Sequence, residues 1–302
     1  MEVTKRSYSS SANLGPGYDI LSLAHKAFFD SVTVKKTGGT GIKIISDSTP
    51  ENPESNSAGL SVLKILGDRG IKEGLEVRIN KGVPIGLGLG SSGASSSASV
   101  KAVNELFELN MSPDEMVYYS MYGEIAACGS AHPDNVSSGI YGGLTLISST
   151  SPVRVRKVKI NYEMSLLLII PYSHMEKKTQ KARSMVPDKI SMTDHVLHAS
   201  RISTMLYGFM NGDRDAIREG MMDDIVEKSR EALFPYYRQI REKAISGNAI
   251  SICVSGAGPS ILIFTDENTK KNEIISNTDK IMKSYNVDYN IKETSILEDY
   301  DD

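Results

Sequence analysis

The stretch Lys81–Ala98, KGVPIGLGLGSSGASSSA, decides how the chain is interpreted. Glycines alternate with apolar residues up to Gly90, and small residues follow. Glycine lets a backbone approach a ligand closely and adopt positive φ, and a helix N-terminus offers N–H groups to an anion. Val100 and Val103 continue at helical spacing, which argues against a flexible linker. We therefore expect a phosphate-binding loop that leads into a helix over residues 91–108.

Two standard phosphate-binding templates fit this stretch poorly. The P-loop needs a lysine before its hydroxyl residue, and the stretch contains no Gly-Lys pair. Gly88-x-Gly90-x-x-Gly93 matches the dinucleotide fingerprint, but that fingerprint needs a strand running directly into its first glycine. Here Lys-Gly-Val-Pro-Ile-Gly separates the glycines from the expected strand 74–80. A nicotinamide-dependent oxidoreductase is therefore a distant alternative.

The stretch resembles the P-x-x-x-G-L-G-S-S-A-A signature of the GHMP kinases, a family named for galacto-, homoserine, mevalonate and phosphomevalonate kinases. Gly93 stands where the family usually has alanine. Ser10–Asp19, SSANLGPGYD, and Ser255–Ser260, SGAGPS, resemble the first and third motifs of the family, in the right order. Gly129–Gly143, GSAHPDNVSSGIYGG, is similar to the homoserine kinase branch. Mevalonate kinases carry a Ser-Gly-x-Asp pattern at that point instead.

The order of expected elements agrees with the fold that this resemblance implies. Strands and helices mix along the chain, which predicts an α+β class. From about residue 163 the order is strand, helices, two strands, helix, strand, which is close to a split βαβ arrangement. The resemblance implies the GHMP kinase fold, with a ribosomal-protein-S5-like nucleotide domain over residues 1–162. A ferredoxin-like domain is expected over residues 163–302, with the substrate between the two.

Composition places the chain among ordinary globular proteins. It has 302 residues, 40% hydrophobic and 24% charged, and a formal net charge of −3, which argues against bulk nucleic-acid binding. No apolar run approaches the roughly 20 residues that span a bilayer, and residues 1–9 show no secretory signal. The two cysteines, Cys128 and Cys253, do not indicate a disulfide framework. We expect a cytoplasmic homodimer without nucleic-acid or membrane partners, and a frayed acidic tail at Glu298–Asp302.

The resemblance implies that ATP is the phosphoryl donor and that Mg²⁺ accompanies it. Magnesium takes oxygen ligands and keeps several waters, so one hydroxyl and one carboxylate suffice; the resemblance places these roles on Ser92 and Glu124. Small and apolar residues follow Glu124, an unusual place for an unpaired acid. The expected nucleotide contacts are Asn56, Lys81, Pro84, Ile85, Gly86, Leu87, Gly88, Leu89, Gly90, Ser91 and Ser92.

Structural roles compete with three of these assignments. Asn56 precedes the expected helix 57–69 and would serve equally well as its N-cap. Lys81 is nearly as well explained as a surface lysine. Glu124 could instead pair with or cap a helix.

An amino-acid alcohol needs acceptors for its ammonium group and a guanidinium for its carboxylate. Asn13 and Asp19 flank the Gly-Pro-Gly turn, where both residue types are common for conformational reasons alone. His132 has no Cys or His partner at zinc spacing, which argues against a metal site there. By resemblance, the expected substrate contacts are Asn13, Asp19, His132, Thr179, Arg183 and Arg230.

No residue qualifies as a catalytic base. Asn135 stands where mevalonate kinases place an aspartate, and an amide cannot accept the hydroxyl proton at neutral pH. We therefore hypothesise a reaction in which the γ-phosphate ultimately takes the proton. Asn135 and Asp19 would align the attacking oxygen, and Glu124 would hold the metal, which makes these three the expected catalytic residues.

The resemblance therefore implies ATP-dependent phosphorylation of the side-chain hydroxyl of L-homoserine, a step of threonine biosynthesis. One alternative keeps the kinase chemistry and changes the acceptor to mevalonate, shikimate or another small alcohol; the His132–Asn135 segment and the two arginines argue against it. Another alternative is a relative that binds a nucleotide or metabolite without turnover. Intact Ser92, Glu124 and glycine loops disfavour that alternative.

Overall fold

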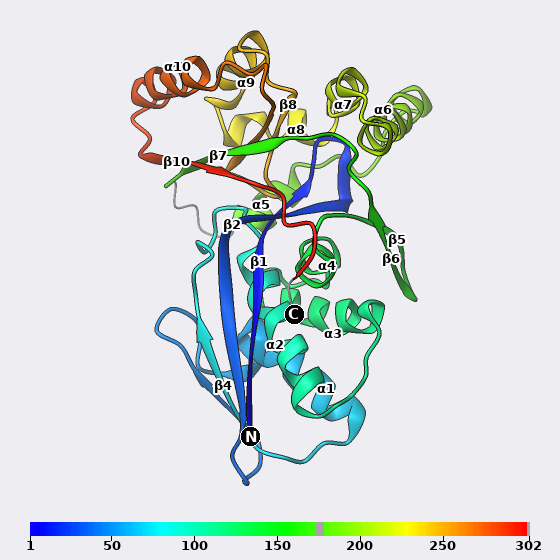
Figure 1. Cartoon of the computed structure of the whole chain (residues 1–302), viewed down its shortest axis with the longest axis vertical. Coiled ribbons are helices and arrows are strands. Elements are labelled where there is room, and N and C mark those ends of the chain that lie inside the picture. The colour runs from blue at the N-terminus through cyan, green and yellow to red at the C-terminus, as the bar shows by residue number, and fades with distance from the viewer. Residues whose placement is uncertain (173–177, 301–302) are drawn as a thin grey trace.

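The computed structural model describes residues 1–172 and 178–300, and it builds two sheets from them, one from each half of the chain (Figure 1). The first sheet has the order β3-β4-β2-β5-β6, and β1 pairs with β2 beside this path. Only the β3–β4 pair is parallel among these strands. The strands are β1 (Glu2–Asn13), β2 (Gly17–Lys36), β3 (Ile42–Ile45), β4 (Leu75–Asn80), β5 (Leu144–Thr150) and β6 (Val153–Val158).

Helices of the first half pack around α2 (Ser91–Leu106), the helix that follows the glycine-rich loop. The serine cluster of α2 is buried, because its hydroxyls hydrogen-bond backbone carbonyls: that of Ser96 donates to Ser120 (2.5 Å) and that of Ser97 to Val136 (3.3 Å). Small side chains therefore let α2 approach its neighbours closely. The neighbouring helices are α1 (Ser57–Arg69), α3 (Pro113–Cys128) and α4 (Asp134–Tyr141), and the short η1 (Pro53–Ser55) packs on α1 and α3.

The second sheet has the order β10-β7-β9-β8, which is the ferredoxin-like arrangement that the sequence predicts. Its strands are β7 (Ser165–Pro171), β8 (Ser251–Val254), β9 (Ile261–Thr265) and β10 (Tyr289–Thr294). The helices are α5 (Lys178–Ser184), α6 (Met192–Asn211), α7 (Arg214–Gly220), α8 (Val226–Ser229), η2 (Glu231–Leu233), α9 (Tyr237–Ser246) and α10 (Lys271–Ser284).

Both faces of the second sheet are buried, which explains the continuous apolar run in β7. Leu166 and Leu168 join a core shared with Leu21 and Leu23 of β2, while the intervening Leu167 packs on the other side with residues of α9 and α10. Because the shared core joins the two sheets, the elements that carry the sequence motifs are packed together. The first sheet uses strands up to residue 158 and the second begins at residue 165; the boundary at 162/163 stays a prediction.

The last described segment returns to the first sheet, so the expectation of a frayed tail is wrong for residues 298–300. The backbone N–H of Leu297 donates to Ala24 (3.0 Å), and the Tyr300 hydroxyl lies 3.2 Å from the Ser7 hydroxyl and accepts from the backbone N–H of Tyr8 (3.2 Å). The Tyr300 ring also packs against the ring of Tyr8. An aromatic residue within the acidic run is what anchors it. Asp301 and Asp302 lie outside the described residues.

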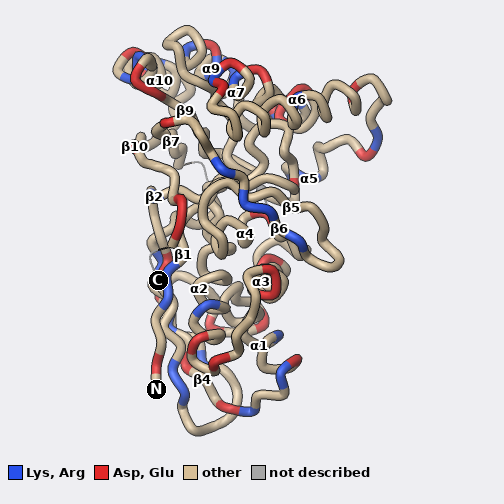
Figure 2. Tube along the Cα trace, turned by 45° about the vertical axis from the view of Figure 1, so that its right-hand side comes forward, with Lys and Arg blue, Asp and Glu red and all other residues tan. Residues whose placement is uncertain are grey.

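In the view of Figure 2, positively and negatively charged residues are interspersed along the chain trace. The most continuous basic segment is β6, where the arginines Arg154 and Arg156 are exposed and alternate with buried Val153 and Val155. This is the amphipathic strand pattern. Among the helices that the structure describes, none is long and apolar enough to cross a bilayer. The expected homodimer stays a prediction.

Candidate active site

A cavity of about 410 Å³ gathers most of the residues that the sequence singles out. Two predicted nucleotide contacts, Pro84 and Leu87, do not line it. Leu87 packs its side chain against the shared core instead. The predicted residues that line the cavity are Asn13, Asp19, Asn56, Lys81, Ile85, Gly86, Gly88, Leu89, Gly90, Ser91, Ser92, Glu124, His132, Asn135, Thr179, Arg183 and Arg230.

The glycine-rich loop turns its carbonyls into the protein. The carbonyl of Leu87 accepts from the N–H of Ser260 (3.2 Å), that of Gly88 from the Ser255 hydroxyl (2.6 Å), and that of Leu89 from the N–H of Ser10 (3.1 Å). In a trans peptide the next N–H lies on the opposite side from the carbonyl. The N–H groups of residues 88–90 therefore point away from these contacts, and all three residues line the cavity.

Two glycines of this loop have positive φ and leave no room for a side chain. Gly88 has φ +78°, and a Cβ on it would overlap the carbonyl of Ser255. Gly90 has φ +67°, and a Cβ on it would overlap the Ser10 hydroxyl. Gly90 is also the N-cap of α2 and supplies no side-chain cap. The first turn of α2 therefore opens toward the cavity with its N–H groups, as an anion site requires.

Glu124 is the most unusual carboxylate of the site. It is 6% exposed, and within the described part of the chain its Oε1 has no hydrogen-bond partner. Burial raises the pKa of Glu124 to about 7, while a hydrogen bond from Ser92 and the charge of Lys81 oppose this rise. A buried oxygen without a partner costs free energy unless a ligand supplies one. The arrangement suits a cation held beside Ser92.

The side chain of Lys81 is only 9% exposed, so its description as a surface lysine is wrong. Its ammonium group donates to the carboxylate of Asp30, to the carbonyl of Ser91 (2.8 Å) and to the Ser95 hydroxyl (2.9 Å). Asp30 is fully buried and also accepts from the N–H groups of Gly82 and Val83, both at 2.9 Å. The pair thus fixes the segment before the glycines to the first turn of α2.

Sequence reasoning missed Asp30, although a signal was present. Asp30 is the one acid within the alternating apolar stretch 27–36, AFFDSVTVKK. In the structure its side chain is fully buried. A buried acid in a strand calls for a specific partner.

Asn56 acts as the N-cap of α1, the structural role that competed with nucleotide binding. Its Oδ1 accepts from the N–H of Gly59 (3.1 Å), and its Nδ2 donates to Thr49 (3.0 Å) and to the carbonyl of Pro50 (2.8 Å). Both amide hydrogens are therefore used within the protein. A contact between Asn56 and a nucleotide stays a prediction.

Two guanidinium groups and a carboxylate also line the cavity. Arg183 forms two parallel hydrogen bonds with Asp19, each of 3.0 Å. Arg230 is buried and donates to the carbonyl of Ala182 (2.8 Å). Both guanidinium groups lie over the ring of Tyr18, at 5.5 and 5.0 Å from its centre. Tyr18 is a site residue that the sequence reasoning did not single out.

Asn13 joins the first motif to the third. Its Oδ1 accepts from the N–H of Asp19 (3.1 Å), and its Nδ2 donates to the carbonyl of Gly256 (2.9 Å). Asn13 and Asp19 both have positive φ, +76° and +59°, which Asn and Asp tolerate better than most residues. The turn-forming role that competed with substrate binding is therefore present at both positions.

The start of α4 places two polar residues on the cavity wall. Asn135 accepts a hydrogen bond on Oδ1 from the Ser10 hydroxyl (2.8 Å). Asp134 was not among the expected site residues; it is buried, and burial together with the negative charge of Asp19 raises its pKa to about 6. His132 lies nearby and contacts Ser130 (2.7 Å), and burial and Arg183 lower its pKa.

Comparison with known proteins agrees with this geometry. The family models "GHMP kinases N terminal domain" and "GHMP kinases C terminal" match residues 57–143 and 205–282. The chain is 49% identical to the homoserine kinase of Saccharolobus solfataricus, over 96% of this chain and 95% of that protein. It is 46% identical to that of Sulfurisphaera tokodaii, over 93% and 92% of the two chains.

Solved structures give the same result. A homoserine kinase from Cytophaga hutchinsonii superposes with a TM-score of 0.90 at 29% identity, covering 99% of this chain and 96% of that one. The mevalonate kinase of Methanococcus jannaschii, at 18% identity, shares the fold with a TM-score of 0.71 over 98% and 99% of the two chains. The chain described here therefore belongs to the GHMP kinases, and within them to the homoserine kinases.

Proposed function

We propose that the protein transfers the γ-phosphoryl group of ATP to the side-chain hydroxyl of L-homoserine, giving O-phospho-L-homoserine and ADP on the route to threonine. The observation that carries this proposal is the polarity of one cavity. Backbone N–H groups line it together with a carboxylate oxygen that has no partner among the described residues, and a second group of lining residues holds two guanidinium groups and the carboxylate that pairs with Arg183. The first group suits a metal-bound triphosphate, and the second suits a zwitterion.

At the nucleotide end, backbone groups would hold the phosphates. The N–H groups of residues 88–90 and of the first turn of α2 are aligned for anions. Ser92 and Glu124 fit Mg²⁺, because the orphaned Oε1 of Glu124 needs a cation or donor and a hydroxyl lies beside it. Magnesium bound there would neutralise charge on the β- and γ-phosphates. Lys81, paired with Asp30, fixes the loop to the first turn of α2.

At the acceptor end, an amino acid can enter the existing ion pair. Its carboxylate would bind Arg230 and Arg183, and its ammonium group would bind Asp19, so that each charge of the pair keeps an opposite partner. Asn13, His132 and Thr179 are proposed to complete the substrate pocket by hydrogen bonding. Mevalonate and shikimate carry a carboxylate and no ammonium group, so they would leave Asp19 without a cation of the substrate.

The transfer itself needs alignment more than acid–base chemistry. The homoserine oxygen attacks the γ-phosphorus, and the bond from that phosphorus to the β–γ bridging oxygen breaks, so that ADP leaves with the electron pair. The hydroxyl proton passes to the transferred phosphoryl group and then to solvent. Asn135 and Asp19 hold the attacking oxygen in line. Asn135 neither gains nor loses a proton.

The test is ADP release, coupled to NADH oxidation, with homoserine, mevalonate, shikimate, serine and threonine supplied separately. We expect substantial turnover with homoserine, with O-phosphohomoserine identified by mass spectrometry. The Glu124→Gln variant serves as a matched control for contaminating kinases. Turnover with mevalonate or shikimate alone would refute the proposed acceptor. Equal and negligible ADP release from all five would refute the kinase activity.

A further inference from the structure

The carboxamide of Asn135 is held on one side by Ser10, a residue of β1 with no assigned role in the chemistry above. The Ser10 hydroxyl donates to Oδ1 of Asn135 over 2.8 Å, and the N–H of Ser10 donates to the carbonyl of Leu89. Gly90 lies directly beneath: a Cβ on it would overlap the Ser10 hydroxyl and lie 2.9 Å from the Asn135 oxygen. Through its hydroxyl and its backbone N–H, Ser10 thus joins the first strand to α4 and to the glycine-rich loop.

This hydroxyl decides which way the carboxamide faces. The oxygen and nitrogen of an amide have nearly the same size, so hydrogen bonds alone select the orientation. Ser10 is 1% exposed, and among the described residues Asn135 is the acceptor that its hydroxyl reaches. The reverse orientation would turn an NH₂ group toward Ser10 and leave the buried hydroxyl hydrogen without that acceptor, which is unfavourable.

The NH₂ group therefore faces the cavity that Asn135 lines. Within the described part of the chain, no acceptor is bonded to it. Resting on the proposed function, we propose that Ser10 is a positioning residue: it turns the NH₂ group of Asn135 toward the point of phosphoryl transfer, where Asn135 acts as a hydrogen-bond donor to the reacting oxygens.

A donor is what this place requires. Negative charge accumulates on the oxygens around the γ-phosphorus as the transfer proceeds, and a preorganised neutral donor stabilises that charge. An aspartate at the same place would set one oxygen against Ser10 and the other, as an anion, against the phosphoryl oxygens. The preference for an amide follows from the direction in which Ser10 holds it.

The test is a double-mutant cycle with Ser10→Ala and Asn135→Ala. Ser10→Ala should lower kcat about tenfold, the equivalent of one buried hydrogen bond, with KM for ATP and homoserine within twofold. Asn135→Ala should lower kcat about 100-fold, as loss of an oxyanion donor does. The double variant should match Asn135→Ala alone, because Ser10 acts through Asn135.

Ser9→Ala is the matched control. Ser9 precedes Ser10 in β1 and is also buried. Its hydroxyl contacts His25 and the carbonyl of Phe28, and Ser9 does not line the cavity. It should lower the melting temperature as Ser10→Ala does and leave kcat within twofold. An equal loss of kcat in Ser9→Ala and Ser10→Ala would overturn the proposal. So would a double variant in which the losses of kcat from Ser10→Ala and Asn135→Ala are fully additive.

A spectroscopic measurement separates this proposal from the proposed function. The side-chain NH₂ signal of Asn135, assigned by its disappearance in Asn135→Ala, should shift in Ser10→Ala and stay in place in Ser9→Ala. A protein that is inactive on homoserine but shows this pattern would refute the function and keep the positioning role. An active protein whose NH₂ signal is unmoved by Ser10→Ala would refute the positioning role alone.

Discussion

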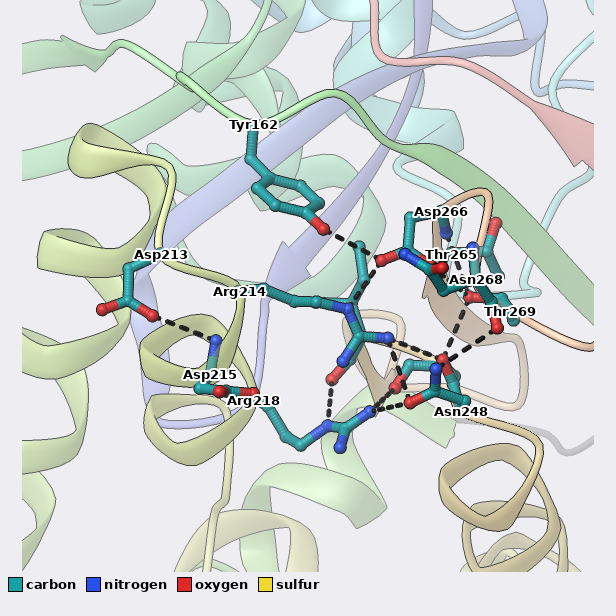
Figure 3. A network of polar contacts seen from close by, with 12 residues as sticks. Tyr162, Asp213, Arg214, Asp215, Arg218, Asn248, Thr265, Asp266, Asn268 and Thr269 are labelled. Carbon is teal, nitrogen blue, oxygen red and sulfur yellow. Dashed lines mark hydrogen bonds and ion pairs between the residues drawn. The ribbon is translucent and has the colours of Figure 1, made fainter.

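Two polar clusters, each built around a buried carboxylate, differ in how that carboxylate is partnered. In the second half of the chain, Arg214 donates to Asp266 (2.6 Å) and to the carbonyl of Asn248 (2.7 Å), and Arg218 donates to the carbonyls of Ala249 and Ile250 (Figure 3). Tyr162 and Thr269 complete the hydrogen bonds to Asp266. In the cavity cluster, by contrast, no residue of the described ranges 1–172 and 178–300 gives Oε1 of Glu124 a hydrogen bond.

The two carboxylates respond to these surroundings in opposite ways. Burial alone would raise the pKa of Asp266, but hydrogen bonds from Arg214 and Thr269 outweigh it and hold that pKa below its ordinary value. At Glu124 burial prevails and raises the pKa to about 7. A cluster whose carboxylate has all its hydrogen-bond partners within the protein stabilises the fold. A cluster whose buried carboxylate lacks such a partner is suited to binding a ligand. Substitutions in the two clusters should therefore differ in whether they lower activity or stability.

Glu124→Gln should have the largest effect on activity. We expect kcat/KM to fall about 1,000-fold, because the amide keeps the shape of the side chain but cannot supply an anionic ligand to Mg²⁺. The melting temperature without ligand should not fall, since the change removes a desolvated acid. The measurement pairs steady-state kinetics with thermal unfolding. A loss below tenfold would refute the role of Glu124.

Arg214→Met should show the reverse pattern. It strips Asp266 of its cation in a place where that carboxylate is 3% exposed, so the free energy of unfolding should fall by about 3 kcal/mol. For the folded protein, kcat/KM should stay within twofold. Urea unfolding and kinetics at low temperature check both values. A folded variant that loses more than tenfold in kcat/KM would show that this network also serves catalysis.

The sequence anticipated the cavity cluster better than the satisfied one. Glycine spacing and the helix caps predict the loop, α1 and α3 within a residue or two, because turns and caps are set by local chemistry. The partners of Asp30 and Asp266 lie 51 and 52 positions away in the chain. Local patterns carry no information on such pairs.

The same reasoning explains what was missed within the site. Tyr18 lies beside an expected site residue, and Asp134 belongs to the polar segment His132–Asn135 without an expected role. Only the packing shows that Tyr18 lies against two arginines and that Asp134 is buried. Asn56 could not be assigned from sequence because an N-cap and a ligand contact call for the same residue type. The structure shows that its three hydrogen bonds cap α1 and hold Thr49 and Pro50, and a contact between Asn56 and a nucleotide stays a prediction.

Arg183→Lys tests the acceptor end. A lysine keeps the charge but loses the two parallel hydrogen bonds with a carboxylate, so KM for homoserine should rise about tenfold. Stability should change little, because the Arg183–Asp19 pair is 40% and 32% exposed and such pairs contribute about 0–1 kcal/mol. Kinetics with varied homoserine, alongside thermal unfolding, tests both statements. An unchanged KM would remove Arg183 from the substrate site.

The pH dependence of nucleotide binding tests the charge on Glu124. With its pKa at about 7, this carboxyl is largely protonated at pH 6 and cannot serve as a metal ligand. KM for MgATP should therefore rise about eightfold between pH 7.5 and pH 6, as for a single group titrating near 7. Glu124→Gln should lack this rise. A wild-type protein with a flat profile over this range would contradict the assignment.

Stability gives an independent check of the same group. A carboxyl with a raised pKa in the folded protein contributes stability that is fully present below its unfolded pKa and is lost as pH rises through the folded value. The free energy of unfolding of the ligand-free wild type, taken relative to Glu124→Gln, should therefore decline from pH 5 to pH 7.5. A difference that grows with pH would mean that the folded protein favours the charged form.

Gly93→Ala should have the smallest effect, and it tests how closely α2 and α4 must approach. A Cβ on Gly93 would lie 3.1 Å from the Cβ of Asn135, so α4 would have to shift by a few tenths of an ångström. Alanine stabilises a helix by about 1 kcal/mol over glycine, which offsets the crowding in the melting temperature. Since a donor misplaced by a fraction of an ångström loses part of its effect, kcat should fall about threefold.

Alanine, which the family usually has at position 93, thus tests how tightly α2 and α4 pack in this chain. Gly67→Ala, at an open position on α1 where an added Cβ meets nothing within 4 Å, is the matched control and should gain stability without a change in kcat. If Gly93→Ala behaves in the same way, then α4 can accommodate the added methyl group without loss of activity. In that case the position of Asn135 is set by Ser10 rather than by the contact between α2 and α4. If kcat falls, the position of Asn135 depends both on its hydrogen bond with Ser10 and on the packing of α2 against α4. A homologous chain with alanine at this position would then need α4 to be placed slightly farther from α2.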